Sequence, residues 1–150
     1  MTPRRGRGRA REEDGSTLIL TVFYCCLSLL LILGVAAATS LYLERKRLFT
    51  LADGAALAGA EAFPLDAVRI TEAGMRPGLR SADVADAVSG YLAAAPHAEF
   101  DGLRVSRADS ADGQSATVSL SARWRPPVLA LLLSAGVPLE VTAVARSVFG

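Results

Sequence analysis

The side chains that most often do chemistry in proteins are scarce in this chain of 150 residues. His97, the single histidine, follows Pro96 in a stretch with loop character, and Glu99 and Asp101 are the nearest acids. One imidazole and two carboxylates on one loop do not have the convergent spacing of a metal site. We therefore interpret His97 as a solvated loop residue.

The other residue patterns that carry catalytic or binding chemistry are missing or incomplete. Asp109 and Asp112-Gly113 share features with a calcium-binding loop, but the full run of oxygen ligands is absent. The sequence contains no Gly-rich phosphate loop after a strand, no G-x-S-x-G and no Cys-x-x-Cys. This pattern predicts a protein without enzymatic activity, cofactor or metal. A small membrane-tethered enzyme is kept as an alternative, and an activity that is lost on His97→Ala would support it.

The two cysteines of the chain, Cys25 and Cys26, are adjacent and lie within a long apolar segment. No other cysteine exists to form a disulfide framework with them. The bulky Phe23 and Tyr24 that precede them do not fit a lipoprotein processing site, which needs small residues. We interpret both cysteines as small apolar side chains at membrane depth.

That apolar segment, residues 15–43, is the element around which the rest of the chain is organised. It carries no charge between Asp14 and Glu44. At about 1.5 Å per residue it is long enough to cross the roughly 30 Å hydrocarbon core of a bilayer. A soluble helix of this kind would need protein on every side, and the remaining residues are too few to provide it. Residues 16–43 are therefore predicted to form one transmembrane helix.

The charges around this segment predict its orientation. Residues 1–15 are expected to be a disordered basic tail, with five arginines among the first eleven residues. By the positive-inside bias these arginines hold the N-terminus in the cytoplasm and contact anionic membrane lipid, although Arg45, Lys46 and Arg47 argue partly the other way. The C-terminal part is then extracytoplasmic. With 16 basic against 15 acidic residues, the chain has no broad basic field for nucleic acid.

A secretory signal peptide is the competing interpretation of the same N-terminal features. Ala36-Ala37-Ala38 resembles a cleavage site of the A-x-A type, with the cut after Ala38. Against it, the apolar run of residues 17–35 is longer than the usual apolar core of a signal peptide, and the helical pattern continues past Ala38. The alternative function is then a small secreted binding protein. It is separated from an anchored protein by whether residues 1–38 persist.

Residues 44–63 continue the helical pattern beyond the apolar segment, up to Pro64, which ends it. This helix has a narrow face of alanine and glycine that favours close packing, either on its own domain or against a second copy. The candidate helix-packing residues are Gly34, Ala38, Ala55 and Gly59. Asp53, the one charge inside the alanine-rich run, is either a solvated acid or the partner of a basic residue on a neighbouring subunit.

Residues 64–150 are predicted to form a small α+β domain outside the cytoplasm. A helix begins near Ser81, which can cap it, and stops at Pro96. The apolar side chains on one face of this helix are Val84, Val88, Tyr91, Leu92 and Ala95. Strands are predicted around Leu103 and Val105, over 115–124 and over 139–146, where apolar and polar residues alternate. A three-stranded, mainly antiparallel sheet covered by the helix satisfies this pattern.

An apolar stretch, residues 126–136, connects the last two predicted strands. Pro127 suits a helix start and Gly136 a helix end, so a short helix is predicted. Its leucines, among them Leu129, Leu132 and Leu133, either cover the core or form a partner-docking or membrane-surface patch.

A basic tail is followed by Gly15-Ser16, the apolar span, the basic patch LERKRL of residues 43–48 and the run LADGAALAGA of residues 51–60. This order of features resembles the N-terminal region of TadE/TadG-like proteins of the Tad (tight adherence, Flp pilus) assembly machinery of bacteria, and the resemblance covers residues 15–62. Gly54 and Gly59 stand where the family more often has alanine. The resemblance implies a bitopic pilin-like or pilus-assembly component. Its partners would be other pilus-assembly or pilin-like subunits, with a homo-oligomer as a further option.

The resemblance also implies a candidate processing site at Gly15 and Ser16. Pilin-like members are cut after a small residue and carry a glutamate at the fifth mature position, which here is Leu20. The TadG-like branch, which keeps its anchor, therefore fits this sequence better. The combined prediction is a non-enzymatic, single-span cell-envelope protein that acts by assembly.

Overall fold

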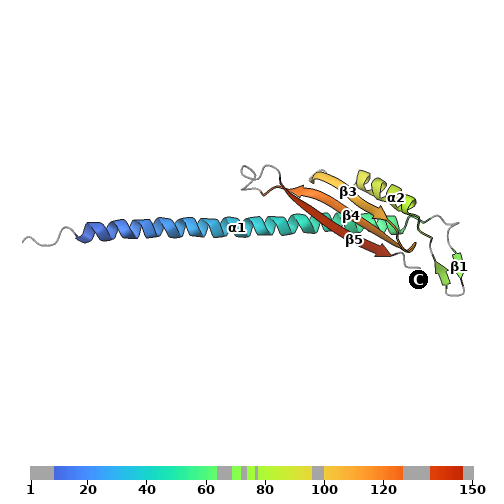
Figure 1. The fold of residues 1–150 in the computed structure, drawn as a ribbon, viewed down its shortest axis with the longest axis horizontal. Helices are drawn as coiled ribbons and strands as arrows, with labels where there is room; N and C mark the ends of the chain where they lie inside the picture. The colour runs from blue at the N-terminus through green and yellow to red at the C-terminus, as the bar shows by residue number, and fades with distance from the viewer. Residues whose placement is uncertain are drawn as a thin grey trace, which may run out of the picture. The chain divides into compact units, whose positions relative to one another are not determined.

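The computed structural model describes residues 9–63, 69–71, 74–76, 78–95, 100–126 and 136–146 of the chain. These residues contain a long helix, a shorter helix, a three-stranded sheet and a two-stranded ribbon (Figure 1). The chain divides into two compact units, Met1–Thr39 and Ser40–Gly150. The predicted α+β class is confirmed, with its long apolar N-terminal helix, three-stranded antiparallel sheet and second helix.

Helix α1, Arg9–Ala60, is one continuous α-helix that contributes to both units. It begins at Arg9, so residues 9–15 are helical where the sequence predicts disorder. The residue types explain this difference, because alanine, arginine and glutamate are strong helix formers and no glycine or proline interrupts residues 9–14. At its other end α1 stops at Ala60, shortly before Pro64.

The part of α1 within Met1–Thr39 exposes long aliphatic side chains. Ile19 is 71% exposed and Leu30 is 67% exposed. Within the described residues, α1 is the one helix that is long and apolar enough to cross a membrane, over Thr17–Ala60, and its most apolar stretch is not buried. An apolar surface of this size and exposure is typical of a segment that contacts lipid or another protein.

The sheet of the second unit has the strand order β3-β4-β5, and both pairs are antiparallel. Strand β3 spans Asp101–Asp109, β4 spans Ser115–Trp124 and β5 spans Val137–Arg146. The predicted alternation in β4 is confirmed by its core side chains, which are Ala116, Val118, Leu120 and Ala122. Strand β3 is less regular, since its pairing with β4 shifts register at two places.

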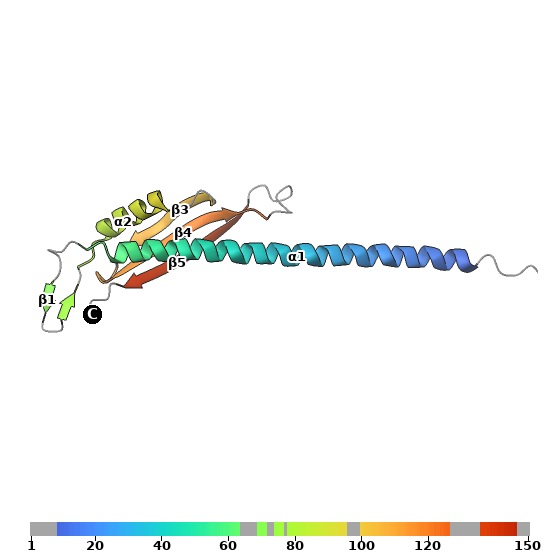
Figure 2. The same ribbon diagram turned by 180° about the vertical axis from the view of Figure 1, so that it is seen from behind.

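The C-terminal part of α1 and the second helix, α2 (Ser81–Ala94), pack on the same face of this sheet (Figure 2). Trp124 Nε1 donates a hydrogen bond of 3.3 Å to Ser40 Oγ, while Gly59 lies against Ala116. Between Ser40 and Ala60 the helix therefore runs antiparallel to β4. The core combines the inward side chains of β4 and β5 with Leu48, Ala52, Ala55, Ala56 and Ala60 of α1 and Val84, Val88 and Leu92 of α2.

Helix α2 begins at Ser81, as the sequence indicates, but the predicted cap by the Ser81 side chain is wrong. Arg80 occupies the N-cap position and makes no side-chain capping hydrogen bond. The Ser81 hydroxyl instead accepts a hydrogen bond from the backbone N–H of Ser110 at 3.2 Å and donates a hydrogen bond to the carbonyl oxygen of Ser110 at 3.3 Å. These two bonds tie the start of α2 to the residue that follows β3.

One further segment differs from the sequence predictions, and a second predicted segment lies outside the described residues. Strands β1 (Arg69–Thr71) and β2 (Gly74–Arg76) form an antiparallel ribbon that the sequence pattern does not predict, because three-residue strands are too short to show alternation. The predicted helix over 126–136 falls mainly on residues 127–135, which lie outside the described residues. The same holds for the residues Leu129, Leu132, Leu133, Pro96, His97 and Glu99.

Candidate functional site

Of the two acids that resemble a calcium loop in the sequence, Asp112 shapes a turn, whereas Asp109 ends β3. Asp112 Oδ1 accepts hydrogen bonds from the backbone N–H groups of Gln114 and Ser115, at 2.9 and 2.7 Å. Asp112 Oδ2 accepts one from the Ser115 hydroxyl at 2.8 Å. These bonds, led by the one from Gln114, lower the pKa of Asp112 to about 2. The carboxylate is thus occupied in shaping the connection between β3 and β4, in which Gly113 adopts a positive φ of 67°.

Other acids of the domain are engaged in exposed ion pairs. Asp101 lies 2.8 Å from Arg125, and Asp109 lies 2.9 Å from Arg107. In the part of the chain that the structure describes, no group of three potential ligands could hold a metal ion. Asp101, Asp109 and Asp112 therefore pair with arginines or shape a turn, and the surfaces of α1 become the candidate functional region.

Two of the predicted helix-packing residues, Ala55 and Gly59, are buried inside the domain. A Cβ atom at Gly59 would lie 3.0 Å from Val84 Cγ1 and 3.2 Å from Ala116 Cβ. Gly59 therefore allows α1 to approach α2 and β4 at the same point. Because both residues pack within the chain, their surfaces are not open to a partner subunit.

Gly54 makes a second close approach, which the sequence reasoning missed. The Tyr91 side chain of α2 lies against α1 at this position. A Cβ on Gly54 would collide with the phenol oxygen and lie 2.8 Å from Tyr91 Cζ. The signal in the sequence is the presence of Gly54 and Gly59 in a run that is otherwise rich in alanine. Each glycine marks a place where a side chain of another element lies directly against the α1 backbone.

The other predicted packing residues, Gly34 and Ala38, are exposed on the apolar part of α1. A Cβ at Gly34 would have nothing within 4 Å. Asp53 is also exposed, and its neighbours one turn before and after it, Phe49 and Leu57, are 48% and 53% exposed. Asp53 therefore lies between two exposed apolar side chains on the surface of α1.

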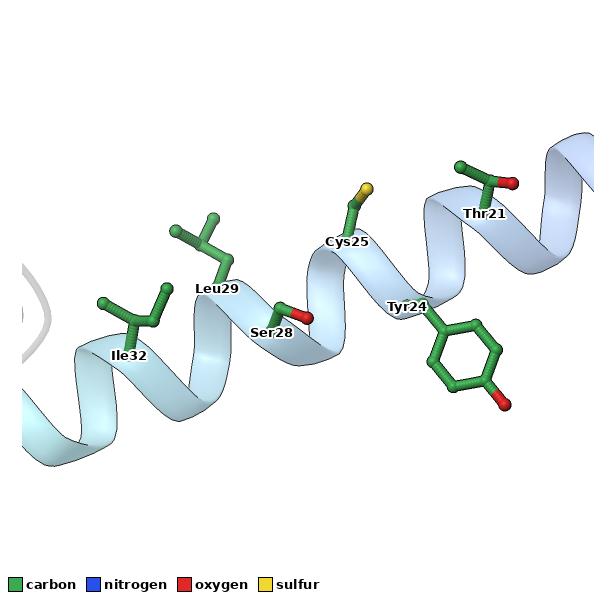
Figure 3. Close-up of a pocket in the computed structure, with 6 residues that line it drawn as sticks. All are labelled: Thr21, Tyr24, Cys25, Ser28, Leu29 and Ile32. Atoms are coloured by element: carbon green, nitrogen blue, oxygen red, sulfur yellow. The ribbon is translucent and has the colours of Figure 1, made fainter.

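Polar side chains gather on one side of the apolar part of α1. Figure 3 shows a groove on the helix surface, which is lined by Thr21, Tyr24, Cys25, Ser28, Leu29 and Ile32. Cys25 and Cys26 are both free and exposed, and of the two Cys25 lines this groove. The helical repeat brings the polar residues together, because residues three and four apart are neighbours on a helix surface.

One helix thus carries both a long exposed apolar surface and a buried face of alanine and glycine. Residues 15–62 match the Tad family of TadE/G-like Flp pilus-assembly proteins. The predicted relationship to this family is confirmed for that segment. Comparisons with curated proteins and with solved structures give no match.

The segment that matches the Tad family includes both kinds of surface. It starts at Gly15, in the candidate processing site Gly15-Ser16, where the backbone is helical. It ends at Ala62, just beyond the last residue of α1, and so includes every α1 residue of the hydrophobic core. The segment that matches the Tad family therefore consists of an exposed apolar helix and of the α1 residues that pack in the hydrophobic core of the domain.

Proposed function

We propose that this protein is a single-pass membrane component of a Tad/Flp-type pilus or of a related secretion assembly, and that it acts structurally rather than as an enzyme. The observation that carries the proposal is the match of residues 15–62 to the Tad family, over a helix that is exposed and apolar in one part and buried in the other. The exposed apolar part, residues 16–43, would anchor the chain in lipid. The buried part, residues 44–63, would belong to an interaction domain that directly follows the anchor in the sequence.

The composition of the first part supports a place in the membrane. Residues 16–43 have no charge, and the most apolar stretch of Thr17–Ala60 is not buried. Exposing apolar surface to water costs about 25 cal/mol per Å², whereas the hydrocarbon of a bilayer solvates it. The five arginines in the first eleven residues favour a cytoplasmic N-terminus, with residues 64–150 on the other side of the membrane.

The second part of α1 supports a domain that presents contacts to other subunits. Leu48, Ala52 and Ala56 are fully buried, so residues 44–63 complete the domain rather than link to it. We propose that its partners are other pilus-assembly or pilin-like subunits. One candidate contact is Asp53 with Phe49 and Leu57, and a second is the set Leu129, Leu132 and Leu133, which lies outside the described residues.

The intact mass of the chain in carbonate-washed membranes of the native host tests the anchored function. We expect a full-length chain in the membrane fraction. A membrane-bound chain that lacks residues 1–15 would indicate pilin-like processing between Gly15 and Ser16, despite Leu20. A soluble product that begins at Thr39 would contradict the anchor.

Pilus assembly in the same host tests the contact surface on α1. Asp53→Arg should reduce the amount of assembled pili, because it reverses the charge at the centre of the exposed surface. Asp86→Arg, which reverses an exposed acid on α2, is the matched control. Equal pilus assembly by both variants would remove Asp53 from the contact.

A secreted binding domain, released by signal-peptide cleavage, is the second candidate function. One observation favours it: every residue of the hydrophobic core, from Leu48 onward, belongs to the unit Ser40–Gly150. A cut after Ala38 would leave that core intact, and Ser40 would keep its hydrogen bond from Trp124. Finding this product free of the membrane would therefore establish the secreted function.

A further inference from the structure

The hydroxyl side chains between residues 17 and 39 of α1 lie on one side of the helix, whereas Ser16 and Ser40, which flank this stretch, lie outside that side. Between residues 17 and 39 they are Thr17, Thr21, Tyr24, Ser28 and Thr39. With 3.6 residues per turn, these positions fall within an arc of about 60° around the helix. Cys26 and Leu30 lie on the opposite side. The first four residues, Thr17, Thr21, Tyr24 and Ser28, form what we term the hydroxyl stripe.

The hydroxyl stripe has the spacing of a contact between two helices. Its successive members are four, three and four residues apart, which is the heptad spacing of left-handed helix pairs. The same spacing continues to Leu31, Val35 and Ala38. Ala38, a candidate for close packing, therefore belongs to this seam, whereas Gly34 lies to one side of it.

In hydrocarbon, the hydroxyl groups of Thr21, Tyr24 and Ser28 need hydrogen-bond partners. Thr21 Oγ1 donates a hydrogen bond to the carbonyl oxygen of Thr17 at 2.8 Å. The Thr21 hydroxyl oxygen can still accept a hydrogen bond from another group. Tyr24 is 57% exposed, and its ring projects from the helix with the phenol oxygen pointing away from the backbone (Figure 3). Tyr24 lies about five residues from the middle of residues 16–43, so its Cα falls within the hydrocarbon of a bilayer that is centred on this stretch.

We propose that the hydroxyl stripe is the surface through which two copies of this chain pair in the membrane as parallel helices. This inference rests on the proposed membrane role and deepens it by naming a partner. In a two-fold parallel pair each residue faces its own copy, so the surface must be complementary to itself. A hydroxyl both donates and accepts a hydrogen bond and so meets this condition, whereas a stripe of like charges would repel its copy. Tyr24 and Ser28 line the same open side of α1 as Thr21, so the three hydroxyl groups are exposed together.

Disulfide cross-linking of the full-length chain in vesicles of phosphatidylcholine and phosphatidylglycerol tests the geometry. In a background of Cys25→Ala with Cys26→Ala, a single cysteine is introduced on the stripe by Thr21→Cys or Ser28→Cys. Leu30→Cys, at a similar depth on the opposite side, is the control. We expect oxidation to give a covalent dimer of the two stripe variants and a monomer of the control. Equal cross-linking at residue 30, or none on the stripe, would overturn the proposal.

Energy transfer between labelled full-length chains in the same vesicles tests the chemistry. The triple variant Thr21→Val, Tyr24→Phe, Ser28→Ala removes three hydroxyl groups with little change in shape. Its dissociation constant should rise by on the order of twentyfold. The matched control, Cys26→Ala with Leu30→Ala, removes side-chain volume from the opposite side and should pair like the wild type. A triple variant that pairs as tightly as the wild type would refute the role of the hydroxyl groups.

These vesicle measurements distinguish pairing from the proposed function. A soluble product in the host contradicts the anchored function. Cross-linking and energy transfer in vesicles still test whether the hydroxyl stripe binds a second copy of the chain. A wild-type chain that stays monomeric in vesicles, and cross-links in host membranes to a different protein instead, overturns self-pairing and leaves the anchored function standing.

Discussion

Residues 17–39 and residues 40–60 of α1 are both helical and both rich in apolar side chains, yet they meet different packing demands. The first part exposes leucine, isoleucine and valine, whereas the second buries mainly alanine together with Leu48, and Leu51 is partly buried against the core. Large side chains suit a helix that lipid surrounds. A helix that lies against a sheet and a second helix needs small ones where the backbones approach closely. Among the apolar side chains, size separates the two parts.

The change between these environments occurs without a break in the helix. In the sequence it is marked by charge, since Glu44, Arg45, Lys46 and Arg47 follow the apolar segment directly. The buried residues begin at Leu48, immediately after this charged patch. An uninterrupted helical pattern therefore does not indicate a uniform environment.

Truncating one leucine in each part should give the largest contrast. Leu48 is fully buried, so Leu48→Ala should lower the free energy of unfolding of the domain by about 2–5 kcal/mol. Leu30 is exposed, and Leu30→Ala should change this free energy by less than about 0.5 kcal/mol. Denaturant unfolding of the full chain in detergent micelles, followed by the fluorescence of Trp124, the single tryptophan, measures both. Equal losses would show that the two parts do not differ in this way.

The glycines of the two parts should respond differently to an added methyl group. Gly54→Ala should destabilise the domain by about 1–3 kcal/mol, because the new Cβ meets the Tyr91 ring. Gly34→Ala, at an open position, should be neutral or stabilising, since alanine is a better helix former by about 1 kcal/mol. The same unfolding measurement applies. In a Tyr91→Ala background the penalty of Gly54→Ala should disappear, and a penalty that persists there would contradict the steric explanation.

The start of the domain on α1 can be located with two neighbouring substitutions. Ser40→Ala removes the acceptor of the Trp124 indole N–H, a part-buried hydrogen bond of 3.3 Å, and should cost about 0.5–1.5 kcal/mol. Thr39→Ala changes an exposed residue one position earlier and should have no effect. The emission spectrum of Trp124 should shift in the first variant alone. Identical behaviour of the two would argue against a boundary between Thr39 and Ser40.

Acid should act on the domain through Asp112 and leave the apolar part of α1 unaffected. In the folded chain, hydrogen bonds lower the pKa of Asp112 from 3.8 to about 2. The unfolded chain therefore binds this proton first, so the stabilisation is complete above pH 3.8 and is lost as the pH falls toward about 2. Asp112→Ala should remove that part of the pH dependence of unfolding. An unchanged acid profile in this variant would contradict the assignment, and residues 15–43, which contain no carboxylate, provide the internal comparison.

Local patterns in the sequence account for most of the fold. The alternation of Ala116, Val118, Leu120 and Ala122 with polar residues predicts β4 because a strand between two environments has a period of two. The incorrect prediction of Ser81 as a cap shows that local patterns do not predict contacts between residues distant in the sequence. Its hydroxyl has two backbone partners at Ser110, and no local pattern shows that these residues come together.

The sequence by itself determined the apolar helix, the three strands of the main sheet and the relationship of residues 15–62 to the Tad family, because length, charge and periodicity are properties of short stretches of chain. Only the tertiary structure decided how the small residues of α1 are used. Ala55 and Gly59 pack within the domain and Gly54 lies against Tyr91, whereas Gly34 and Ala38 are open. In the sequence a small residue on a helix looks the same whether lipid, a second copy or its own domain covers it. What distinguishes these cases is a van der Waals contact with a residue distant in the chain, such as Val84 or Ala116 against Gly59.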